Sequence, residues 1–348
     1  MFKLRFNKNY DEKGVLMFKK ILFTMIPMIA FMATAFAADS DTLGGSFADD
    51  GISARPAGMA GAFTAIADDG NSSWWNPAGV GLLGKRKSIA FTYIPNMYGL
   101  TTGNINRMLL SYGQGDMSGY GGLGASISYL NVNLGSDFTG DTEPQWTEYV
   151  ILLSWGMEIE QFIGMQKYKY PKIAIGVNAK YFSLSTDLKV GDGKTGASGF
   201  GADAGLIIVI KNNFNLGVMA KNIFTSVSWT GASDERLPYA LNGGFFYGIT
   251  PDFIISAEVK SEESDSGKPR ITAYCGGAEY RFNLGKNKQV QSIMLRAGAS
   301  IDPNADSYII SGGTSIAMDT FSIDYAYQFF IKSLLTNDVH RLGLTVYF

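Results

Sequence analysis

Residues 321–331 read Phe-Ser-Ile-Asp-Tyr-Ala-Tyr-Gln-Phe-Phe-Ile, so large apolar side chains alternate with smaller or polar ones. Successive side chains of a β-strand point to opposite faces, and an alternation with a period of two therefore predicts a strand. Ser322, Asp324 and Gln328 share its polar face. One apolar and one polar face is the pattern expected in the wall of a membrane barrel.

The same alternation recurs along the chain from Lys87 onward. It predicts an all-β fold, a transmembrane antiparallel β-barrel of about fourteen strands, which is an even number. We place the strands near 88–94, 106–113, 121–132, 148–157, 171–183, 199–209, 214–223, 237–247, 252–260, 271–283, 291–301, 307–318, 320–331 and 340–348.

The lengths of the connections separate a membrane barrel from a soluble β-sandwich, whose strands also alternate. Connections after odd-numbered strands are mostly long, as at 133–147, 184–198, 224–236 and 261–270, and the others are mostly short. Long external loops that alternate with short periplasmic turns are typical of outer-membrane barrels. The exception is 158–170, where Ile159, Phe162 and Ile163 are spaced as on a helix and predict a short periplasmic helix.

The amino-acid composition agrees with a barrel that exposes little of its surface to water. Charged residues make up 17% of the chain, below the roughly one quarter of soluble domains, and aromatic residues reach 13%. No run of about eighteen apolar residues follows residue 38, so the sequence offers no transmembrane helix there. A closed barrel is the other structure that can span a bilayer.

Both ends of the chain indicate export to the bacterial cell outer membrane. An apolar run at 21–36 ends in Ala35-Phe36-Ala37, which predicts a secretory signal peptide over 1–37. Residues 1–16 are an extended start of that signal or an upstream start that is not used. The chain finishes on alternating apolar residues and Phe348, which resembles the strand that the barrel-assembly machinery recognises. Outer-membrane lipid and that machinery are the expected partners, and nucleic acid is not.

The segment at 38–87 precedes the barrel of 88–348 and predicts a plug. Between residues 57 and 67 the large side chains are Met59, Phe63 and Ile66, spaced as on one face of a short, slim helix. Asn76-Pro77 fits a second helix start, with Asn as N-cap and Pro in the first helical position.

A family resemblance lies in the same segment. A small-residue stretch, an Ala-Asp-Asp turn and an Asn-Pro-Ala-Gly step resemble the N-terminal segment of the PorV/PorQ family, within the superfamily of FadL-type barrels for hydrophobic compounds. The resemblance implies a narrow channel for hydrophobic or amphipathic small molecules, obstructed by its plug. The expected plug or gate residues are Met59, Phe63, Ile66, Asp68, Asp69, Trp74, Trp75, Asn76, Pro77, Ala78 and Gly79.

Other interpretations stay open at this point. PorV-like members take part in type IX secretion, so the resemblance also allows a partner protein for surface cargo, with secretion components as its partners. A purely structural barrel is a third interpretation. The plug residues would then brace the wall, and Trp74 and Trp75 would equally suit an aromatic belt at the membrane interface.

Catalytic, metal and cofactor sites find little support. His340 is in register with the apolar face of its strand, so we expect it to face lipid and assign no catalytic residue. Cys275 is a lone cysteine. The acidic groups Asp137, Asp141 and Glu143, or Glu262, Glu263 and Asp265, lack an ordered ligand spacing and are interpreted as solvated loop charge. We therefore expect neither an enzyme nor a bound metal or cofactor.

Overall fold

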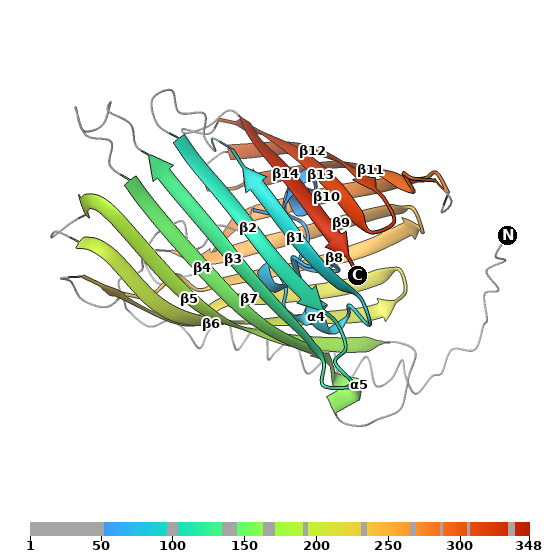
Figure 1. Cartoon of the computed structure of the whole chain (residues 1–348), viewed down its shortest axis with the longest axis horizontal. Coiled ribbons are helices and arrows are strands. Elements are labelled where there is room, and N and C mark those ends of the chain that lie inside the picture. Colours follow the sequence, from blue (N-terminus) through green and yellow to red (C-terminus); the bar gives the residue numbers. More distant parts are fainter. Residues whose placement is uncertain are drawn as a thin grey trace.

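In a computed structural model of the chain, the strands of the described residues close into one antiparallel barrel (Figure 1). The structure describes residues 52–95, 104–133, 145–162, 171–190, 194–230, 235–264, 269–285, 288–304, 307–332 and 338–348. The first strand pairs with the last, so that Phe91 lies opposite Leu344. The predicted fourteen-stranded antiparallel barrel is confirmed for this part of the chain.

The strands follow the chain in order around the barrel. Their bounds are β1 Lys87–Ile94, β2 Asn104–Gln114, β3 Gly122–Asn133, β4 Gln145–Glu158, β5 Lys172–Val190, β6 Lys194–Lys211, β7 Phe214–Trp229, β8 Ala240–Thr250, β9 Phe253–Glu263, β10 Pro269–Asn283, β11 Ser292–Asp302, β12 Ser307–Ala317, β13 Phe321–Ile331 and β14 Asp338–Tyr347. We call the end with the connections after odd-numbered strands the loop end, and the opposite end the turn end.

The two faces of the wall are those that the alternation predicts. On β13, Ile323 and Tyr325 are 47% and 36% exposed, whereas the side chains between and beside them, such as Asp324, are buried in the lumen. Large apolar side chains cover the outer face of most other strands in the same way. Among the described helices, none is long and apolar enough to cross a membrane.

Several predicted connections are shorter in the structure. β5 continues to Val190 and β6 begins at Lys194, so most of the predicted connection at 184–198 is strand. β7 likewise continues to Trp229 into the predicted connection at 224–236. These extensions are rich in Gly, Ser, Thr and Asp, which made them resemble loops, but their alternation continues and places Leu184 inside. The predicted periplasmic helix is present as one turn, α5 Ile159–Phe162, and 163–170 lie outside the described residues.

The plug is a compact coil with three short helices, and the predicted helix over 57–67 is wrong. The helices are α2 Ala54–Gly58, α3 Ser72–Trp75 and α4 Ala78–Gly81. After α2 the backbone turns at Ala60 and Gly61, which have positive φ angles of 54° and 80°. The amides of Phe63 and Thr64 then donate to the carboxylate of Glu258 on β9, at 2.9 and 2.8 Å. A wall acceptor thus replaces the carbonyls that a helix would have supplied.

Wall glycines let the plug backbone touch the barrel. A Cβ at Gly205 would lie 2.0 Å from the Asn76 side chain, and one at Gly176 would lie 2.3 Å from the backbone of Pro77. Such distances leave no room for any side chain. Similar contacts come from other inward glycines of the described wall, namely Gly124, Gly156, Gly217, Gly277 and Gly298.

Candidate functional site: the plug and the lumen

The lumen is apolar in its loop-end half. Inward side chains from many strands form one buried cluster there, and we call this region the apolar lumen. It includes Ile94, Leu109, Val150, Leu152, Phe182, Leu184, Val227, Trp229, Leu237 and Val339. The cluster continues into the plug through Phe63 and Trp75, whose rings meet edge to face at 5.8 Å between centroids. Open porin channels have polar interiors, whereas the side chains of this half of the lumen are mainly apolar.

Charged side chains also lie in this half of the lumen. Arg107 on β2 and Glu148 on β4 are 1% and 3% exposed. The indole of Trp146 donates to Glu148 at 2.5 Å. The apolar lumen therefore also contains buried charge.

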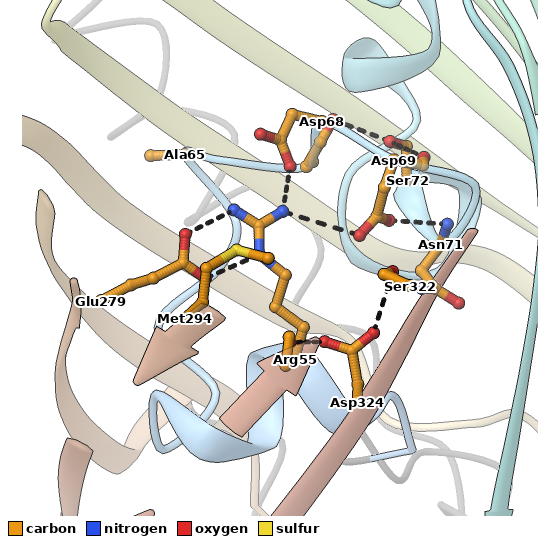
Figure 2. A network of polar contacts seen from close by, with 12 residues as sticks. Arg55, Ala65, Asp68, Asp69, Asn71, Ser72, Glu279, Met294, Ser322 and Asp324 are labelled. Atoms are coloured by element: carbon orange, nitrogen blue, oxygen red, sulfur yellow. Dashed lines mark hydrogen bonds and ion pairs between the residues drawn. The ribbon is translucent and has the colours of Figure 1, made fainter. Parts of the chain in front are cut away.

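At the level of the plug the wall is polar, and ion pairs hold the plug to it (Figure 2). Arg55 of α2 lies 2.5 Å from Asp68 and 3.7 Å from Asp69 of the plug, and 3.0 Å from Glu279 on β10. Arg296 on β11 lies 2.6 Å from the same Glu279. One wall carboxylate thus joins an arginine of the plug to an arginine of the barrel.

The opposite side of the plug is held by neutral hydrogen bonds. Asn178 on β5 donates to the backbone oxygen of Ser73 at 2.9 Å. Asn76 donates to Thr64 within the plug at 2.9 Å and to Leu206 on β6 at 3.2 Å. Together with the glycine contacts, these bonds fix the plug on both sides of the lumen.

A cavity of about 520 Å³ lies beside the ion-pair network and reaches residues at the turn end of the wall. We call it the lower cavity. Arg55, Asp68, Asp69 and Asn71 line it from the plug, and Asp324 lines it from β13. Burial raises the pKa of Asp69 to about 6, Arg55 opposes this rise, and Asp68 adds to it. The lower cavity therefore differs from the apolar lumen in both charge and polarity.

The structure brings the sequence-predicted plug residues together inside the barrel. Met59 and Phe63 are fully buried, and Ile66 is nearly so. Met59 packs on wall glycines, and Phe63 packs on Trp75 and under the guanidinium of Arg55 at 5.1 Å. Their common spacing does not come from one helix face, because no helix spans 59–66.

The tryptophans and the Asn-Pro-Ala-Gly step also lie inside. Trp74 and Trp75 are buried in the plug, so the interface-belt interpretation of these two residues is wrong. The side chain of Asn76 accepts a hydrogen bond from the backbone N–H of Ala78 at 3.1 Å, but α4 begins at Ala78 with Pro77 as its N-cap, one residue later than predicted. A Cβ at Gly79 would lie 2.0 Å from the backbone of Ala67, so only glycine fits there.

Asp68 and Asp69 differ from one another. Asp69 makes the predicted turn, because its side chain accepts a hydrogen bond from the Asn71 amide at 2.8 Å. Asp68 instead binds Arg55. Sequence reasoning missed Arg55, Glu279 and Arg296, because their pairing joins segments far apart in the chain and leaves no local pattern.

The residues set aside for chemistry lie where they suit structure. His340 faces outward and its Nδ1 lies 2.7 Å from the Tyr325 hydroxyl. Glu262 and Glu263 end strand β9, and Glu263 is buried and pairs with Arg236 at 2.6 Å, so its interpretation as solvated loop charge is wrong. Asp137, Asp141, Glu143 and Asp265 lie outside the described residues. In the part of the chain that the structure covers, no three acidic, His or Cys side chains group as metal ligands.

Comparison with known proteins finds relatives in fold only. No protein-family model and no curated protein matches the sequence. Among solved structures, the CymD monoaromatic hydrocarbon channel superposes with a TM-score of 0.55 at 13% identity, over 86% of this chain and 98% of that chain. The Pseudomonas putida toluene transporter TodX superposes with a TM-score of 0.54 at 14% identity, over 89% of this chain and 99% of that chain. The chain has the fold of these hydrocarbon channels.

This shared fold agrees with the FadL-type architecture that the N-terminal segment implies. A TodX mutant channel matches similarly, with a TM-score of 0.52 at 13% identity, over 86% of this chain and 97% of that chain. The narrower resemblance to the PorV/PorQ family stays a prediction.

Proposed function

We propose that the protein is a plugged channel of the bacterial outer membrane for hydrophobic or amphipathic small molecules. The observation that carries this proposal is the apolar lumen, which is closed toward the turn end by the plug. Solved structures with this fold include a toluene transporter and a monoaromatic hydrocarbon channel, which adds support. No feature of the described residues favours a secretion partner.

The two halves of the lumen imply a sequence of steps. A hydrophobic molecule that enters at the loop end gains about 25 cal/mol for each Å² of apolar surface that leaves water. Arg107 and Glu148 offer a charged contact to the polar end of an amphipathic molecule. The plug and its ion pairs then block further movement, so passage requires displacement of the plug, followed by exit through the wall or into the periplasm.

The test is uptake by cells that produce the protein, with toluene and a fluorescent fatty acid as probes. Leu109→Asn places an amide in the apolar lumen with little change in volume, and we expect it to reduce uptake per assembled barrel. Leu110→Asn is the matched control, because Leu110 is the next residue and faces outward. Equal uptake by wild type, by Leu109→Asn and by cells without the protein would contradict the proposed function.

A further inference from the structure

We propose that the lower cavity is a second binding site, separate from the hydrophobic passage, for a small zwitterion that carries a protonated amine and an acidic group. The inner part of the cavity offers acceptors and excess negative charge, and its rim offers guanidinium groups that have no carboxylate partner among the described residues. The ligand would point its amine inward and its acidic group toward the rim.

The inner part holds more carboxylates than cations. Asp68, Asp69 and Asp324 line it, and Glu279 joins the same network. Arg55 and Arg296 are the guanidinium groups that pair with these acids, and both already bind Glu279. Four carboxylates thus share two arginines, which favours a further cation.

The side chain of Asn71 indicates independently that a hydrogen-bond donor is missing from this site. It lines the lower cavity and is only 5% exposed. Its side-chain oxygen is buried and has no hydrogen-bond partner among the described residues. A buried acceptor is costly to leave without a donor, so this oxygen suits a ligand that brings an N–H group. Asp69 lies close to the same residue, since the backbone N–H of Asn71 donates to its carboxylate at 2.8 Å.

An organic ammonium group fits this arrangement better than a metal ion. The described residues contain no group of three acidic, His or Cys side chains placed to hold a metal. An ammonium group has three N–H donors, which matches the oxygens of Asp68, Asp69 and Asn71 in number. The cavity volume of about 520 Å³ also exceeds what a single ion needs. Burial is the main cause of the raised pKa of Asp69, and the opposing charge of Arg55 does not cancel it.

The rim supplies the opposite charge. Arg86 and Arg281 line the same cavity, and both side chains are exposed. Arg86 donates to the backbone oxygen of Leu83 at 3.1 Å, and neither arginine has a carboxylate partner in the described part of the chain. The ion-paired arginines Arg55, Arg236 and Arg296 differ from these two in that respect. A carboxylate or phosphate at the far end of the ligand would meet Arg86 or Arg281.

The test is calorimetric titration of the purified full-length chain in detergent. The probes are 4-aminobutyrate, butylammonium and butyrate, which separate the amine from the acid. We expect saturable binding of 4-aminobutyrate, about tenfold weaker binding of butylammonium, and no binding of butyrate. Asn71→Leu and Asp68→Asn should each weaken 4-aminobutyrate binding about tenfold. Arg281→Gln should lower 4-aminobutyrate affinity to that of butylammonium.

The control is Asp116→Asn, which removes an exposed carboxylate that accepts a hydrogen bond from the Gly119 backbone N–H and is not among the residues that line the cavity. Heat-modifiable gel migration shows that each variant is an assembled barrel. Absence of 4-aminobutyrate binding, equal binding of butyrate, or unchanged binding by both Asn71→Leu and Asp68→Asn would overturn the proposal. Because the assay measures binding without transport, its result is independent of the proposed channel function.

Discussion

Arg55 of the plug binds Glu279 of β10 through two parallel hydrogen bonds of 3.0 and 3.1 Å, across 224 positions of sequence. Both side chains are largely buried, at 16% and 4% exposure. Glu279→Gln removes the negative charge that Glu279 shares between Arg55 and Arg296. We expect this change to weaken plug docking by up to about 3 kcal/mol.

The measurement for Glu279→Gln is conductance in planar bilayers, which should rise, with heat-modifiable migration unchanged. The control is Asp319→Asn, an exposed carboxylate outside the network. Conductance of Glu279→Gln equal to that of the control would show that this ion pair does not hold the plug.

The pKa of Asp69 predicts how plug docking depends on pH. Its pKa in the docked plug is about 6 against an ordinary 3.8, so the docked state binds more protons than the released state. The stabilisation is therefore complete below about pH 4 and is lost as pH rises to about 6. We expect conductance to increase over that interval in wild type and to stay flat in Asp69→Asn. A wild-type channel that opens on acidification would contradict this sign.

A single methyl group tests the fit between plug and wall. Gly205→Ala would place a Cβ 2.0 Å from the Asn76 side chain, so the plug must shift at a cost of about 1–3 kcal/mol. Gly243→Ala is the matched control, since a Cβ there meets nothing within 4 Å. Proteolysis of the plug in detergent should be faster in Gly205→Ala alone, and equal rates would contradict the contact.

Arginine substitutions test the two faces of the wall. Ile323→Arg places a charge on the outer face and should cost about 2–4 kcal/mol near the middle of the bilayer. Thr345→Arg on the neighbouring strand points into the lower cavity and should cost less. Ala326→Arg is a poor comparison, because Ala326 packs against Ala54 and Ala57 of α2. Similar losses of folded barrel for Ile323→Arg and Thr345→Arg would contradict the face assignment.

Removal of residues 57–67 tests the plug as a barrier. The wall strands bond to one another around the closed ring, so we expect the deletion to leave an assembled barrel and to raise permeability to small antibiotics. Phe63→Asp, which buries a charge near Glu258, should do the same to a smaller extent, and Phe63→Leu is its control. Unchanged permeability in an assembled deletion would show that this segment is not the gate.

The wall was predictable from sequence because its rule is local. Each strand repeats the alternation seen at Ile323 and Asp324, and the bilayer and lumen impose it separately on every strand. The plug follows a different rule. Its backbone donors at Phe63 and Thr64 depend on Glu258, which lies more than 190 positions away. Helical spacing at Met59, Phe63 and Ile66 was therefore a coincidence, and the network around Arg55 had no local signal at all.

The inward glycines also bear on how such proteins can be recombined. Seven wall positions lack a side chain where Met59, Thr64, Ser73, Asn76 and Pro77 approach. The inner surface of this barrel is thus complementary in shape to its own N-terminal segment. A plug transplanted from another barrel would seat only if the matching glycines came with it, so the first and later parts of the chain have to be exchanged as one unit.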